Sequence, residues 1–109
     1  MISWEDFDKV DIRVGTILTA VDFPSAKKPA YQLTIDFGEM GIKKSSAQLT
    51  ALYPKEELTG KQVIAVVNFP PKQIANFFSE CLVLGIYNEH NDVVLLQPGL
   101  PVKNGAKIG

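Results

Sequence analysis

The chain has 109 residues, 46% of them hydrophobic and 21% charged, which fits one globular domain with a single core and excludes a disordered chain. A formal net charge of −1 excludes attraction to nucleic acid through overall charge, so any such site needs a local group of cations. The single cysteine, Cys81, excludes an internal disulfide and a cysteine-based metal cluster.

The N-terminal segment predicts a short helix. Ser3 suits the N-cap position, and Asp6 stands where the acid of a capping box belongs. Residues 1–6 lack the basic and then apolar layout of a signal peptide, and no apolar run in the chain is long enough to span a membrane. We therefore expect one domain over residues 1–109 that is soluble and cytoplasmic.

The first half of the chain predicts three strands. Residues 11–23 form a long apolar run in which Gly15 is a candidate bulge. Residues 31–38 give the clearest strand, since every second side chain is apolar. A turn separates this strand from a polar, weakly alternating one over residues 42–50.

The second half begins with a short helix. It is predicted over residues 53–61 by Pro54 near its first turn and Gly60 just past its end. An almost continuous apolar strand over residues 61–69 follows, as a closed and buried sheet requires. Further strands are predicted over residues 80–87 and 93–99, with a hairpin signal at Asn104-Gly105.

This order of elements predicts an all-β fold. Several short strands, with one short helix between the third and the fourth, suit a five-stranded Greek-key barrel of the OB type with N- and C-terminal extensions. The strand faces and loops of such barrels bind oligonucleotides. A β-sandwich is the alternative, because the number of strands alone does not separate the two folds.

The connection between residues 68 and 79 is the main candidate for a binding site. Pro70 and Pro71 end the preceding strand because proline has no N–H for the ladder, and we expect one helical turn over residues 72–76. Its cation and its amide and hydroxyl groups suit phosphate, ribose or a base edge. These candidate RNA contacts are Asn68, Lys72, Gln73, Asn76 and Ser79. The alternative is an ordinary solvated loop.

Two neighbouring phenylalanines in the same connection have different expected roles. We expect one of Phe77 and Phe78 to lie in the core and the other to line a stacking or peptide groove. Pro71 is the further candidate for a peptide groove. The alternative places both rings in the core.

A second candidate RNA contact is a polar stripe on the strand over residues 42–50. By the two-residue period of a strand, Lys44 shares a face with Ser46 and Gln48, and this stripe suits a phosphate backbone. The alternative is a solvent-facing strand. Lys27 and Lys28 lie in a loop that OB-folds use for ligands, but loop lysines ordinarily only increase solubility.

No residue pattern indicates catalysis, a cofactor or a metal site. The chain has no nucleophile–base pair and no glycine-rich phosphate loop, and His90 has no second histidine or cysteine beside it. Cys81 is expected to be a buried, inert thiol. Arg13 is expected to pair with Asp11 or Asp36 rather than to reach a phosphate.

Five segments in chain order resemble the tRNA-binding domain family, and within it the CsaA type. They are DIRVG at 11–15, KKPAYQLTIDFG at 27–38, SSAQLT at 45–50, VVNFPPKQIANFFSE at 66–80 and NGAKI at 104–108. The ordered set spans nearly the whole chain and is far more specific than any one segment. Other branches of the family carry Ser-x-Gly-Met where this chain has Ser79 followed by Glu80, Cys81 and Leu82, and the CsaA type is the closer fit.

The resemblance implies a non-catalytic OB-fold that binds tRNA by its elbow or stem structure rather than by base sequence. It also implies a homodimer. As an alternative function, it implies an export-related chaperone that binds unfolded precursor proteins.

Apolar residues at both ends of the chain also favour a homodimer. They are Trp4, Phe7, Leu95, Leu96, Leu100 and Val102. A small barrel does not need this much apolar surface for its own core. The alternative is that these residues fold back on their own barrel.

Overall fold

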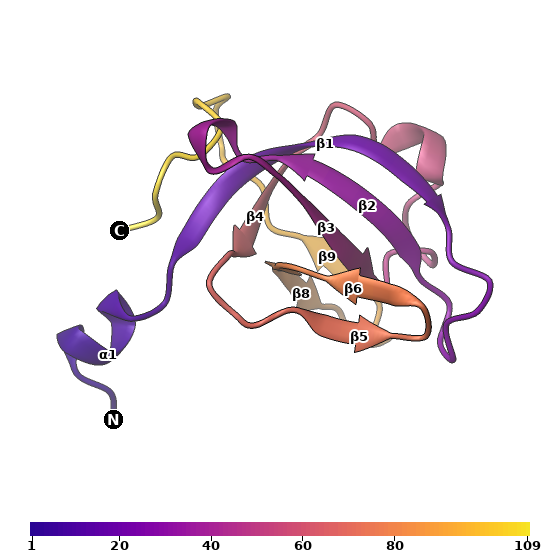
Figure 1. Ribbon diagram of the computed structural model, residues 1–109, viewed down its shortest axis with the longest axis horizontal. Coiled ribbons are helices and arrows are strands. Elements are labelled where there is room, and N and C mark those ends of the chain that lie inside the picture. The colour runs from indigo at the N-terminus through magenta and orange to yellow at the C-terminus, as the bar shows by residue number, and fades with distance from the viewer.

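In the computed structural model, which describes residues 1–109, one long curved strand organises the sheet (Figure 1). β1 (Ile12–Asp22) pairs antiparallel with β4 (Gln62–Val66) over its first half and with β2 (Tyr31–Asp36) over its second half. Because the two halves have different partners, β1 crosses the whole sheet and curls it into a nearly closed barrel.

The five strands of the barrel follow the order β3-β2-β1-β4-β7. β3 (Ile42–Ala47) and β7 (Leu82–Val83) are the end strands, and they lie against each other. Two separate hairpins complete the fold, namely β5 (Lys72–Ile74) with β6 (Phe77–Ser79), and β8 (Gly85–Tyr87) with β9 (Val93–Leu95). The predicted all-β, five-stranded barrel is confirmed, and the sandwich is set aside because one sheet curls round to meet itself.

The main core lies inside the barrel and follows the predicted alternation of β2. Tyr31, Leu33 and Ile35 are buried, and Phe37 continues the row beyond the end of the strand. The Tyr31 hydroxyl donates to the carbonyl of Tyr53 at 2.7 Å, so its one polar atom is satisfied. This cluster of 12 buried residues also contains Leu95, which therefore folds back on its own barrel instead of facing a partner.

The N-terminal helix α1 (Trp4–Asp8) forms through the predicted capping box. The Asp6 amide donates to Ser3 Oγ at 3.1 Å, and the Ser3 amide donates to the Asp6 carboxylate at 3.0 Å. No residue of α1 is buried, and Figure 1 shows the helix projecting away from the barrel. Neither this helix nor any other has the length and apolar character needed to cross a membrane.

The bulge in β1 lies later than predicted. The register of β1 against β2 shifts between Ile17 and Thr19, so Gly15 is not the bulged residue. Gly15 instead allows close packing, because a Cβ atom there would lie 2.6 Å from Ile35 and 2.7 Å from Phe37. Sequence alone does not distinguish a glycine needed for close approach from one needed for a bulge.

The segment after the two prolines is a hairpin, and the helical turn predicted over residues 72–76 is wrong. Lys72 pairs with Ser79 and Ile74 pairs with Phe77 across the two strands. The turn between the strands includes Ala75, whose φ is 53°. Because both prolines precede Lys72, every residue of β5 keeps its N–H.

Two further predictions need smaller corrections. The helix predicted over residues 53–61 is a single 3₁₀ turn, η2 (Lys55–Glu57), and a similar turn, η1 (Gly38–Met40), precedes β3. Asn104 and Gly105 do form a turn, but no hairpin follows. The chain beyond the turn returns to β1 instead, where the Val14 amide donates to the carbonyl of Ala106 at 3.0 Å.

Candidate nucleic-acid interface

An open depression lies between the loop after β1 and the β5–β6 hairpin. It has a volume of about 610 Å³, and three lysines line it. Lys27 and Lys28 come from the loop over residues 24–30, and Lys72 comes from β5. The other lining residues are Ser25, Ala26, Ala30, Ser46, Gln48, Gln73, Ile74 and Ala75. We call this depression the lysine hollow.

The charge of the lysine hollow is uncompensated. No aspartate or glutamate lines it, although the chain carries 12 acidic residues. The ion pairs in the structure join Lys9 to Asp6, Arg13 to Asp11 and Lys55 to Asp22, and none involves a lysine of the hollow. A local group of free cations on a nearly neutral protein is the arrangement that an anionic ligand requires.

Two further lining residues come from the end of β3 and the segment that follows it. Ser45 points inward and is fully buried, so Lys44 and Ser46 point outward, as the strand period predicts. Ser46 and Gln48 both line the hollow. Their hydroxyl and amide groups share the lining with the three lysines and suit ribose or phosphate oxygens.

Lys44 lies beside the hollow and not within it. Its Nζ stands 5.3 Å from the centroid of the Phe77 ring, a distance typical of a cation–π contact. Its backbone holds the neighbouring segment, since its amide donates to the Glu80 carboxylate at 2.9 Å and its carbonyl accepts from the Glu80 amide at 2.7 Å. The position of this cation is therefore tied to β6.

Two other predicted contacts already make hydrogen bonds within the protein. Ser79 Oγ accepts from the Ser46 amide at 3.1 Å and donates to the Cys81 carbonyl at 3.2 Å. Asn68 Oδ1 accepts from the Asp11 amide at 3.0 Å, and its Nδ2 donates to the Lys9 carbonyl at 2.7 Å. The side chain of Asn68 therefore fastens the segment before β1 to the end of β4.

The remaining predicted contacts belong to the hairpin. Gln73 lines the hollow, and its Nε2 donates to the Ala75 carbonyl at 3.1 Å. Asn76 is exposed in the turn of the hairpin. The structure thus gathers Ser46, Gln48, Lys72 and Gln73 around one depression. Lys44 and Ser79 stand next to it, and Asn68 lies at the far end of the Pro70-Pro71 segment.

The loop lysines, which carried only a weak signal in the sequence, lie at the hollow. Lys27 and Lys28 line it together with Ser25, Ala26 and Ala30 of the same loop. The residues that anchor the two ends of their loop, Phe23 and Ala30, are both buried. In the sequence, the apolar residues at both ends of this lysine-bearing loop indicate that the loop is anchored to the core.

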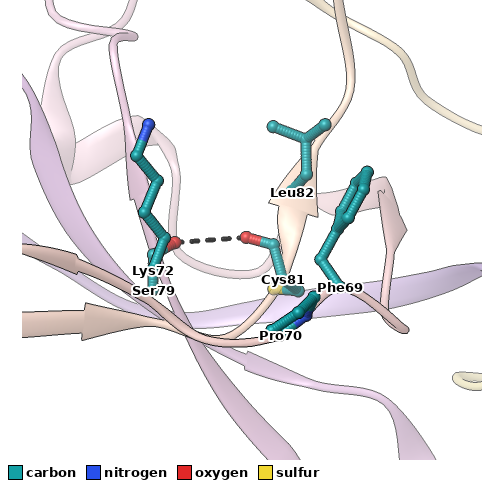
Figure 2. Close-up of a pocket in the computed structure, with 6 residues that line it drawn as sticks. All are labelled: Phe69, Pro70, Lys72, Ser79, Cys81 and Leu82. Carbon is teal, nitrogen blue, oxygen red and sulfur yellow. Dashed lines mark hydrogen bonds between the residues drawn. The ribbon is translucent and has the colours of Figure 1, made fainter.

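A second depression, of about 300 Å³, lies beside β6 and β7 and is mostly apolar (Figure 2). In Figure 2, Phe69 and Leu82 stand together on one side and Lys72 stands on the other. Pro70, Ser79 and Cys81 complete the lining. We call this depression the apolar pocket, and Lys72 borders both it and the lysine hollow.

The residues predicted for a peptide groove, Phe77, Phe78 and Pro71, do not line the apolar pocket. Phe77 is buried and Phe78 is 48% exposed, so the two rings divide between core and surface as expected. Phe69 and Pro70 line the pocket where Phe78 and Pro71 were predicted to. Phe69 was not predicted as a lining residue because the strand predicted over residues 61–69 included it, whereas β4 ends at Val66.

Two further ionisable residues, Cys81 and Arg13, have surroundings that suit a structural role. Burial raises the pKa of the Cys81 thiol to about 11, so it stays protonated near neutral pH. Arg13 donates to the Asp11 carboxylate at 2.6 Å and to the Gly105 carbonyl at 3.1 Å, which confirms its structural role. No three His, Cys, Asp or Glu side chains are grouped so that they could hold a metal ion.

Comparison with known proteins finds one family model and several relatives that match nearly the whole chain. Residues 12–107 match the model of a family described as a putative tRNA-binding domain. The methionine–tRNA ligase of Pyrococcus horikoshii is 38% identical over 107 residues, which is 98% of this chain and 14% of the ligase. That of Bacteroides fragilis is 35% identical over 107 residues, which is 98% of this chain and 16% of the ligase. The chain thus spans only a small part of these relatives.

Solved structures of similar length resemble the whole chain. The chaperone CsaA of Bacillus anthracis is 54% identical with a TM-score of 0.95, over 100% of this chain and 99% of that one. The CsaA chaperone protein of Picrophilus torridus is 55% identical with a TM-score of 0.95, over 100% of both chains. A protein of Pyrococcus horikoshii described as related to methionyl-tRNA synthetase is 28% identical with a TM-score of 0.88, over 100% of this chain and 98% of that one.

Proposed function

Because this chain belongs to the tRNA-binding domain family, we propose that it is a non-catalytic module that binds tRNA by backbone and shape. The observation that supports this most directly is the lysine hollow, in which three lysines meet without an acidic neighbour or an ion pair. Since tRNA acts in the cytoplasm, the proposed function implies a cytoplasmic protein.

Phosphate neutralisation supplies the affinity in this proposal. Lys27, Lys28 and Lys72 stand on two walls of one depression, so they can approach neighbouring phosphates of a folded RNA. Each chain would neutralise about two to four phosphates, and a dimer would neutralise twice as many. The predicted residues outside the hollow, namely Lys44, Asn68, Asn76 and Ser79, are proposed contacts for the flanking backbone.

The lining of the hollow favours recognition of the backbone over recognition of bases. No aromatic ring lines it, so it offers no platform on which a base could stack. Ser46, Gln48 and Gln73 present hydroxyl and amide groups that suit a ribose hydroxyl or a phosphate oxygen. We therefore expect binding to many tRNAs with little sequence preference.

A gel-shift titration with bulk tRNA over a series of salt concentrations tests this function. We expect micromolar or tighter binding whose logarithm falls linearly with the logarithm of the salt concentration. Lys72→Ala should weaken binding to all tRNAs alike and make the slope shallower by about one unit. A salt-independent affinity, or no retardation at micromolar protein, would contradict the proposal.

The proposed module is a homodimer. Trp4 in α1 is 88% exposed, and it lines an apolar depression of about 600 Å³ together with Ile2, Ser3, Phe7 and Gly109. A capped helix of five residues without one buried residue has little packing within its own chain to stabilise it. A second copy that covers this surface would remove Trp4 from water and would double the number of lysines available to one tRNA.

A second candidate function is the binding of unfolded precursor proteins. The observation that favours it is the apolar pocket, where Phe69 and Leu82 are exposed beside Lys72. Such a pocket suits an apolar side chain of an extended peptide. The protein should then slow the aggregation of an unfolded client, and tRNA should compete because Lys72 borders both depressions. Unchanged aggregation would remove this candidate.

A further inference from the structure

A small apolar cluster separate from the main core lies under the lysine hollow. Its buried members are Phe23, Ala30 and Phe77, and Ala26 and Ile74 pack against them. Phe23, Ala26 and Ala30 belong to the loop wall of the hollow or its ends, whereas Ile74 and Phe77 belong to the β5–β6 hairpin. The cluster therefore joins the two walls that carry the lysines.

The Phe77 ring is the centre of this cluster. Its centroid lies 5.4 Å from that of Phe23, with the two rings tilted by 59°. Phe77 also pairs with Ile74 across the hairpin, and the Lys44 ammonium stands 5.3 Å from its ring. One side chain thus contacts the loop, the hairpin and the cation that projects from β3.

The loop and the hairpin have few other direct contacts with each other, although the barrel holds each of them: Ser79 and Glu80 at the end of the hairpin bond to β3, and β2 begins directly after the loop. The hairpin is a two-stranded sheet of its own, separate from the barrel sheet. No hydrogen bond or ion pair joins residues 24–30 to residues 72–79. The three lysines repel one another, and no acidic residue of the hollow offsets this repulsion. The apolar cluster is therefore the direct contact between the two cationic walls.

We propose that Phe77, packed against Phe23, is a positioning residue that presets the separation of Lys27 and Lys28 from Lys72 for the tRNA backbone. This inference rests on the proposed function. A fixed separation lets the two walls engage phosphates at once, without a further ordering cost when the RNA binds. Phe77 is itself buried and would act without touching the RNA.

Phe77→Leu tests this role, with Phe37→Leu as the matched control. Both variants make the same change to a buried ring, but Phe37 lies in the main core beyond the far end of β2. Six residues of strand separate it from the loop, a distance of about 20 Å. Both are titrated with tRNA across salt, and circular dichroism and thermal melting report the folded fraction.

We expect Phe77→Leu to bind tRNA about tenfold more weakly, with a salt slope shallower by about one unit. Phe37→Leu should keep the wild-type slope even if its melting temperature falls further. A purely structural role lowers only the concentration of folded protein and leaves the slope unchanged. If Phe77→Leu does not fold, Phe23→Leu removes the same ring contact from the loop side.

The results separate this inference from the proposed function. A wild-type affinity and slope in Phe77→Leu, or equal losses in both variants, would overturn the positioning role. If Lys72→Ala still weakened binding in that case, the tRNA-binding function would stand. Absence of tRNA binding by the wild-type protein would instead overturn the proposed function itself.

Discussion

Ser45 and Cys81 connect β3 to β7 inside the barrel. Ser45 Oγ donates to the Cys81 carbonyl at 3.0 Å, and Cys81 Sγ lies 3.7 Å from the Lys44 carbonyl. Ser45 is the only fully buried polar side chain, and no buried side-chain nitrogen or oxygen lacks a partner. These contacts hold β3 in the orientation that turns Lys44 and Ser46 outward.

The Cys81 thiol should react slowly with alkylating reagents. Its pKa of about 11 lies above the ordinary value of 9.0 because burial disfavours the thiolate. At pH 8 we expect alkylation by iodoacetamide to be about a hundredfold slower in the native protein than in the unfolded chain. Because the native state binds this proton more strongly than the unfolded chain, the thiol contributes to the free energy of unfolding below pH 9. This contribution is lost as the pH rises through 11. Equal rates in the native and unfolded protein would show that the thiol is not buried.

Gly15 should tolerate no side chain. Gly15→Ala places a Cβ atom 2.6 Å from Ile35 and 2.7 Å from Phe37, inside the main core. We expect overpacking to lower the free energy of unfolding by about 1–3 kcal/mol, measured by urea denaturation. Gly99→Ala is the control, since nothing lies within 4 Å of its added Cβ, and it should change stability by less than about 0.5 kcal/mol. Equal effects of the two changes would contradict the packing at Gly15.

At the level of elements, Asn68 links the segment before β1 to the end of β4. Asn68→Ala removes its hydrogen bonds to the backbone of Lys9 and Asp11, so the Asp11 amide should exchange with solvent faster. Hydrogen exchange followed by NMR measures this effect. Asn76→Ala, at an exposed turn residue, serves as the control and should leave exchange unchanged.

The same Asn68 variant separates a structural role from RNA contact. If Asn68 also binds RNA, the variant lowers tRNA affinity in addition to the change in exchange. If Asn68 only fastens the chain, tRNA affinity and the salt slope stay at their wild-type values. Unchanged exchange at Asp11 would contradict the structural role.

Elements whose determinants are local could be predicted from the sequence. The alternation of β2 and the Ser3–Asp6 capping box each lie within a few residues, and both formed as expected. The β5–β6 hairpin could not be predicted because its turn requires a positive φ at Ala75, a residue that carries no turn signal. The apolar side chains of Ile74 and Phe77 stabilise the hairpin by packing against the cluster that contains Phe23, and this contact cannot be read from the local sequence.

Local patterns in the sequence also predicted only part of the candidate site. The strand period placed Lys44 and Ser46 on one face, and the proline-terminated connection pointed to Lys72. The loop wall of the lysine hollow depends on contacts between residues about fifty positions apart, which no local pattern records. Asn68 was proposed from its residue type alone, and only the fold shows that its amide already bonds to the backbone.

At the scale of the whole molecule, the exposed N-terminal helix predicts self-association. Trp4 is the only tryptophan and is 88% exposed, so its fluorescence reports the surface around α1. We expect its emission to shift to shorter wavelength as protein concentration rises from nanomolar to tens of micromolar. Sedimentation should change from monomer to dimer over the same range. Trp4→Ala should sediment as a monomer, whereas a wild-type monomer at micromolar concentration would contradict the dimer.

Charge is distributed unevenly over a nearly neutral barrel. The three lysines of the hollow lie at the end of the molecule where the loop after β1 meets the β5–β6 hairpin. Lys103 and Lys107 belong to the C-terminal segment, shown in yellow at the other end in Figure 1. The central claim is that the position of the lysines in the hollow, and not the net charge, determines tRNA binding.

Two double variants of equal charge test this claim most directly. Lys28→Ala with Lys72→Ala, and Lys103→Ala with Lys107→Ala, each remove two positive charges from a chain whose net charge is −1. In tRNA titrations across salt, we predict that the first pair makes the slope shallower by about two units and weakens binding strongly. The second pair should bind like the wild-type protein. Equal losses in the two double variants would contradict the claim.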